Sequence, residues 1–142
     1  MSDKKISSHE FLEAVKEVSS VFTAHGFRRT TEFEANTPTT ATVVFVGNNV
    51  AFTFTFDIRD QAVDLTVVRL KNGKLLTTWD GGYSASLFAH LVKHCGLRSR
   101  PTATTLQIIN GSQVQRMVAA NMSLLMHAGA AKLLADEVDS IP

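Results

Sequence analysis

The clearest pattern in the chain is a strict alternation of apolar and polar positions. From Val50 to Asp57 the sequence VAFTFTFD puts large apolar residues on one side of an extended chain and small or hydroxyl-bearing ones on the other. Further strand-like runs, separated by turn residues, occupy about 27–34, 40–46, 63–70 and 74–78, and the run at 40–46 is rich in β-branched residues. Since the connections between them are short, we expect these strands to form an antiparallel meander.

Apolar residues at helical spacing lie on both sides of this strand region. A stripe that begins at Phe11 and ends at Phe22 predicts a helix over about 8–25, and Gly26 is suited to cap its C-terminus. A second pattern predicts a helix over about 84–95. A third predicts a long helix over about 112–137, with one inward face made of Val114, Met117, Val118, Asn121, Leu124, Leu125, Ala128 and Leu133.

This order of elements predicts one α+β domain over residues 1–142, a length that fits one core. We expect an N-terminal helix, an antiparallel β-meander of four to five strands, and C-terminal helices packed on one face of the sheet. The other face of such a sheet commonly meets water. Val44, Val46, Val68 and Leu70 share that face, so either another segment such as 97–110 covers them or they form an exposed apolar patch for a partner.

Composition and charge narrow the class of protein. Hydrophobic residues make up 44% of the chain and charged residues 19%, as in folded domains. The net charge of +1 provides no overall attraction to nucleic acid or to an anionic membrane, and we expect neither as a partner. The single cysteine, Cys95, excludes an internal disulfide and fits a reducing compartment. With no signal-peptide pattern at the N-terminus, we expect a cytoplasmic protein.

The motifs of common enzymes are absent or incomplete. The chain has no glycine-rich phosphate loop. Gly82-Tyr83-Ser84-Ala85-Ser86 resembles a nucleophile elbow, but serine stands where the second glycine must allow close packing of strand and helix. We expect Ser84 to cap the following helix instead.

His90 and His94 are four residues apart on a predicted helix, which is a spacing that metal ligands use. The glutamate that activates a zinc-bound water in such motifs is missing. The histidine spacing keeps a small metal-dependent hydrolase as an alternative. Because the glutamate is missing, we expect no catalytic residue, no metal and no cofactor.

Acidic and aromatic residues in the sheet half predict a surface for a protein partner. The only Trp and the only Tyr flank an Asp-Gly-Gly loop, and these residue types are enriched in binding hot spots. Carboxylates lie along the predicted strands and at their turns. The residues that we expect to contact a partner are Glu32, Glu34, Asp57, Asp60, Trp79, Asp80 and Tyr83.

Three segments resemble small bacterial immunity proteins of polymorphic toxin systems, including those of contact-dependent growth inhibition. They are FTAHGF at 22–27, FTFDIRD at 54–60 and NMSLLMHAGAAKLLAD at 121–136. The resemblance implies a cytoplasmic antitoxin that binds one cognate toxin domain, possibly a nuclease, and blocks its active site or substrate groove. A secretion chaperone or adaptor of the same size and class is the alternative. The oligomeric state stays open between a monomer and a weak dimer.

Overall fold

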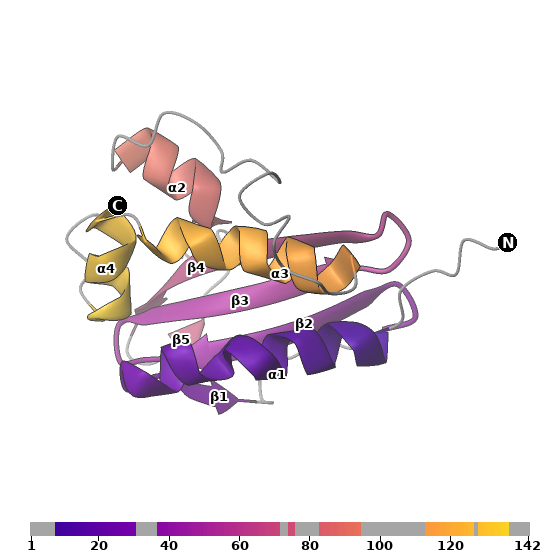
Figure 1. Ribbon diagram of the computed structural model, residues 1–142. Coiled ribbons are helices and arrows are strands. Elements are labelled where there is room, and N and C mark those ends of the chain that lie inside the picture. The colour runs from indigo at the N-terminus through magenta and orange to yellow at the C-terminus, as the bar shows by residue number, and fades with distance from the viewer. Residues whose placement is uncertain are drawn as a thin grey trace, which may run out of the picture.

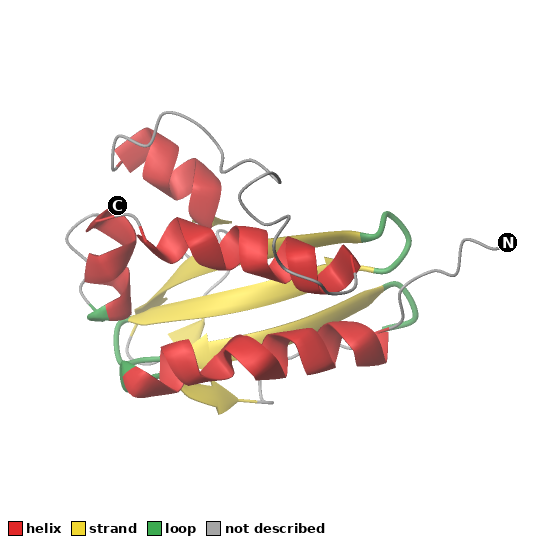
Figure 2. Cartoon of the chain, in the orientation of Figure 1, coloured by secondary structure: helices red, strands yellow, loops and turns green. Residues whose placement is uncertain are grey.

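The computed structural model of the protein describes residues 8–30, 37–71, 74–75, 83–94, 113–126 and 128–136. A helix is followed by an antiparallel sheet and then by further helices, which confirms the predicted α+β class. The helices are α1 (Ser8–Ala24), α2 (Leu87–His94), α3 (Gln113–Ser123), the short 3₁₀ helix η3 (Leu124–Met126) and α4 (Ala128–Leu134). Figures 1 and 2 show α1 and α3 lying next to each other across one face of the sheet.

The strands form one antiparallel sheet with the order β1-β2-β3-β4-β5, and β6 also pairs with β4. They are β1 (Arg28–Thr30), β2 (Thr40–Val46), β3 (Val50–Asp57), β4 (Ala62–Lys71), β5 (Lys74–Leu75) and β6 (Tyr83–Ser86). The bounds of β2 and β3 coincide with the strands expected at 40–46 and 50–57, because their alternation and their flanking turns are both unambiguous. Residues 31–34 and 76–78 of the other expected strands lie outside the described residues.

The helix expected over about 84–95 begins later, because β6 takes the first residues of that segment. β6 pairs with residues 66–69 of β4 and so satisfies backbone groups along that edge of the sheet. The hydroxyl of Ser86 then accepts a 3.1 Å hydrogen bond from the Ala89 N–H, which is the geometry of an N-cap. The cap expected at Ser84 is therefore wrong. Ser84 lies within a strand and not at the strand-to-helix turn that a nucleophile elbow requires.

The end of α1 has the glycine cap that the sequence predicts. Gly26 has a φ of +87°, a conformation that glycine adopts without steric cost. Its N–H donates to the Thr23 carbonyl at 3.1 Å, and the Phe27 N–H donates to the Phe22 carbonyl at 3.0 Å. This pair of bonds is the Schellman motif, which ends the helix and turns the chain into β1.

The helix expected over about 112–137 is not continuous. α3 ends at Ser123, whose hydroxyl donates a 2.6 Å hydrogen bond to the Ala120 carbonyl. Such a bond competes with the helical backbone pattern and often bends helices. η3 follows, and the axis of α4 then runs in a different direction from that of α3, at one end of the sheet (Figure 1). The break keeps leucines on both sides of it buried, including Leu125 and Leu133.

The helix-facing side of the sheet is an aromatic core. Phe22 of α1 stacks on Phe45 of β2, with ring centroids 4.5 Å apart and ring planes 9° from parallel. The same ring contacts Phe52 and Phe54 of β3, with centroids at 5.3 and 5.9 Å. The apolar side of the alternating strand is thus the side that the helices cover.

The opposite side of the sheet carries a second buried cluster. Its members each expose 6% of their surface or less, and they are Val44, Val46, Ala51, Val68 and Leu70. The register puts Val46 beside Ala51 and Ala51 beside Val68, so branched side chains on neighbouring strands pack around a small one. Of the two alternatives for these residues, an exposed apolar patch is wrong, because all of them are buried. Thr53 and Thr55, on the same side of β3, are half-buried.

Candidate binding site

The turn between β3 and β4 holds two of the predicted partner-binding residues in a fixed geometry. The Asp57 carboxylate accepts a 3.0 Å hydrogen bond from the Asp60 N–H. Gln61 has a φ of +54°, and its side-chain amide donates to the Ile58 carbonyl at 2.5 Å. These bonds close the turn on itself. Asp60 and Arg59 are exposed at its tip, whereas Asp57 is half-buried.

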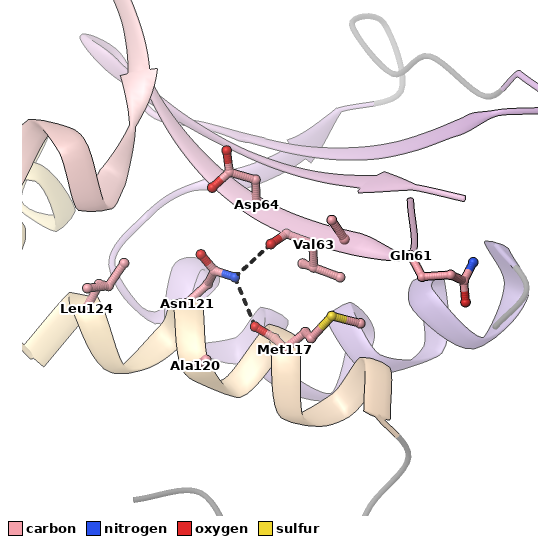
Figure 3. A pocket seen from close by; sticks show the side chains of 8 residues that line it. Gln61, Val63, Asp64, Met117, Ala120, Asn121 and Leu124 are labelled. Carbon is pink, nitrogen blue, oxygen red and sulfur yellow. Dashed lines mark hydrogen bonds between the residues drawn. The ribbon is translucent and has the colours of Figure 1, made fainter. Parts of the chain in front are cut away.

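A pocket of about 300 Å³ lies next to this turn, between the start of β4 and α3 (Figure 3). Its walls come from two segments far apart in the sequence. The described residues that line it are Gln61, Ala62, Val63, Asp64, Met117, Ala120, Asn121 and Leu124. Most of these side chains are apolar, and the polar ones are two amides and one carboxylate, which is the usual make-up of a ligand or anchor pocket.

Asn121 fixes the geometry of this pocket. Its amide nitrogen donates to the Met117 carbonyl at 2.9 Å and to the Val63 carbonyl at 3.3 Å, and so ties α3 to β4. Both amide protons are used, which leaves the side-chain oxygen as an acceptor. In Figure 3 this oxygen points away from both bonds, and the Asp64 carboxylate lies on the other side of the β4 ribbon from Asn121.

Acidic residues outnumber basic ones over residues 57–64. Asp64 is exposed, and its carboxylate accepts a 3.1 Å hydrogen bond from the Leu65 N–H. In the described part of the chain, neither Asp64 nor Asp60 has a basic side chain within ion-pair distance. Arg59 is the one cation among the residues of the turn, 58–61.

Of the seven residues predicted to contact a partner, the structure describes the side chains of two, Asp57 and Asp60. Asp57 and Asp60 are brought together in the turn between β3 and β4, and neither is among the residues that line the pocket. Tyr83 pairs with Arg69 near the other end of β4, about 23 Å away at the usual rise per strand residue. The side chain of Tyr83 lies outside the described residues, and so do Glu32, Glu34, Trp79 and Asp80.

Three pocket residues were not expected to be functional. The sequence pattern put Met117, Asn121 and Leu124 on the buried face of a helix, and Leu124 is indeed buried. The one signal that distinguishes this stretch is Asn121, an amide on an otherwise apolar stripe. A buried or half-buried amide needs partners, so it indicates a contact that apolar neighbours alone do not explain.

The histidine pair of α2 has one buried and one exposed member. His90 is completely buried, and its ring centroid is 5.1 Å from that of the exposed His94. Burial, and then the nearby positive charge of His94, lower the pKa of His90 from its ordinary value of 6.5. Within the described ranges, no group of three or more His, Cys, Asp or Glu residues is placed to hold a metal ion. Cys95 lies outside these ranges.

Comparison with known proteins finds no matching family model, no matching curated protein and no matching solved structure. None of the helices that the structure describes has both the length and the apolar character needed to cross a membrane.

Proposed function

We propose that the protein is an immunity protein, which binds a cognate bacterial toxin domain and neutralises it by blocking the toxin's active site or substrate groove. The observation that carries this proposal is the closed turn with Asp57 and Asp60 beside a largely apolar pocket. Protein interfaces commonly combine an apolar centre that accepts an anchor side chain with a polar and charged rim.

The rigidity of the site also supports a binding role. Hydrogen bonds within the turn and the Asn121 bonds between α3 and β4 hold both walls of the pocket in place. A surface that is ordered before binding loses less conformational entropy when a partner docks. Inhibitor proteins that bind in this way change little on association.

The resemblance to immunity proteins adds a second line of support. Its three segments correspond to the end of α1, the end of β3 with the acidic turn, and the region from the end of α3 through α4. The second of these segments contributes the turn of the candidate site. The proposal also places the protein in the cytoplasm, where a toxin that enters the cell would have to be neutralised.

Co-expression with the toxin domain encoded immediately upstream tests this function. We expect cells to survive toxin induction when the protein is present, and the purified pair to form a complex in isothermal titration calorimetry. The matched control is Glu13→Lys, because Glu13 is exposed on the side of α1 opposite its buried stripe. Cells that die equally fast with and without the protein would rule out the proposal.

A further inference from the structure

We propose that the turn between β2 and β3 is a binding site for a carboxylate, which the protein fills from within with the side chain of Asp136. An external carboxylate binds there when that side chain is removed. Asp136 is therefore a latch, which holds the end of α4 at the sheet and can be replaced without loss of the turn. This site is independent of the immunity function.

The site consists of three successive backbone N–H groups that point at one carboxylate. The N–H of Asn48 donates to Oδ2 of Asp136 at 2.7 Å, and those of Asn49 and Val50 donate to Oδ1 at 2.8 and 2.9 Å. Consecutive N–H groups in a turn form concave sites for anions, and their bonds to a charged oxygen are stronger than bonds between neutral groups. Both oxygens are held, which is an arrangement that a planar carboxylate fills.

The turn has hydrogen bonds of its own that hold these donors in place. The Gly47 N–H donates to the Val50 carbonyl, and the Leu70 N–H donates to the Asn49 carbonyl, both at 2.8 Å. Neither bond involves Asp136. The three N–H groups should therefore keep their direction when the carboxylate is removed, so that an anion binds without first ordering the turn.

Gly47 provides the space that the carboxylate occupies. A Cβ atom at this position would lie 2.7 Å from an oxygen of the Asp136 side chain. The φ of Gly47 is not in the positive region, so its backbone conformation is one that alanine also adopts. The glycine is thus explained by the bound carboxylate and not by the geometry of the turn.

The site can be reached from solvent. Asn48 and Asn49 are exposed, and a cavity of about 320 Å³ adjoins Asp136. The cavity lies between the ends of α1 and α4 and the β2–β3 turn, at one end of the sheet (Figure 1). Arg28 and His25 are exposed residues of its wall. The positive charge of Arg28 favours an anion and opposes the partial negative charge of the two helix C-termini.

Asp136→Gly tests the site, because glycine removes the carboxylate and adopts a φ of +65° without strain. The probe is sodium acetate, compared with sodium chloride at equal ionic strength by nuclear magnetic resonance. We expect acetate to shift the backbone amide signals of Asn48, Asn49 and Val50 in a saturable way, and to raise the urea midpoint of the variant. The unsubstituted protein should show neither effect, because its own carboxylate has a far higher effective concentration.

A double variant, Asp136→Gly with Gly47→Ala, is the matched control. The added methyl group takes the place of a carboxylate oxygen, so we expect the acetate effects to be lost. Amide hydrogen exchange in the single variant tests the turn and the latch separately. The N–H groups of Gly47 and Leu70 should remain protected, whereas the N–H of Ala135, which bonds to the Ala131 carbonyl at the end of α4, should exchange faster.

The test also works if Asp136→Gly is only partly folded. Acetate that binds the folded state raises the folded fraction more than chloride does, which circular dichroism measures, and no gain over chloride would contradict the site. Amide shifts no larger with acetate than with chloride, or an acetate effect that persists in the double variant, would overturn the inference. Loss of protection at Gly47 and Leu70 would overturn it too, because the turn would then depend on Asp136.

Discussion

The backbone N–H of Asn49 donates a 2.8 Å hydrogen bond to the carboxylate of Asp136, and the Asn49 side chain donates a second one of 3.2 Å to the Asp136 carbonyl. The N–H groups of Asn48 and Val50 donate to the same carboxylate at 2.7 and 2.9 Å. Successive backbone N–H groups that converge in this way form a concave site for an anion. Asp136 thus fastens the chain after α4 to the turn between β2 and β3.

Removing this carboxylate should destabilise the fold. We expect Asp136→Ala to lower the free energy of unfolding by about 2–3 kcal/mol, because several charge-assisted hydrogen bonds are lost together. Asp136→Asn should cost less, since asparagine keeps one oxygen and tolerates the φ of +65° found here. Urea denaturation gives both values. Asp60→Asn is the control at an exposed position, and an equal loss at both sites would contradict the assigned role of Asp136.

Gly47 should be sensitive to a single added methyl group for the same reason. A Cβ atom at this position would lie 2.7 Å from an Asp136 carboxylate oxygen. We expect Gly47→Ala to destabilise the protein by about 1–3 kcal/mol, the usual cost of an added group in a tight site. In the Asp136→Ala background the cost should fall, because the clashing group is gone. A double-mutant cycle by urea denaturation measures this coupling, and additive effects would argue against the clash.

Local sequence patterns predicted those elements whose signals are self-contained. The alternation from Val50 to Asp57 determined both the strand and its buried side. Gly26 determined the end of α1, since its φ is one that other residues seldom adopt. The prediction was wrong at residues 83–86, because a short segment with serines is compatible with a helix start as well as with an edge strand. Only pairing with residues of β4 decides between the two.

The candidate site was only partly predictable, for a related reason. Asp57 and Asp60 stood out because turn carboxylates are recognisable in a sequence. Asn121 and Val63 are 58 residues apart, and the hydrogen bond between them exists only once α3 lies against β4. The contact between Asp136 and Asn49 spans 87 residues and carries no local signal. Sequence patterns report the neighbours along the chain, whereas a pocket depends on which distant segments meet.

On the proposed function, charge reversal in the acidic turn should weaken binding of the toxin domain. Asp60 is the sharper test, because its side chain is exposed while the Asp57 carboxylate also holds the turn closed. We expect Asp60→Lys to weaken affinity about two- to tenfold, mainly through slower association, and more at low salt than at high salt. Surface plasmon resonance at two salt concentrations separates the rates. Asp57→Asn keeps the oxygen that accepts the Asp60 N–H but removes the charge, so it separates the effect of charge from the effect of the closed turn. If the Asp60→Lys variant binds with the same association rate as the unsubstituted protein, this turn is not part of the interface.

The buried His90 should make the stability of the fold depend on pH. Burial and the charge of His94 lower the pKa of His90 in the folded state below its ordinary value of 6.5. Between these two pKa values the unfolded chain binds a proton that the folded chain does not, so stability rises with pH. The full contribution is present above pH 6.5 and is lost as the pH falls toward the folded-state pKa. Urea denaturation from pH 8 to 5 should show this loss, and His94→Gln should reduce it. If the free energy of unfolding changes with pH in the same way in the unsubstituted protein and in His90→Gln, other groups cause the pH dependence.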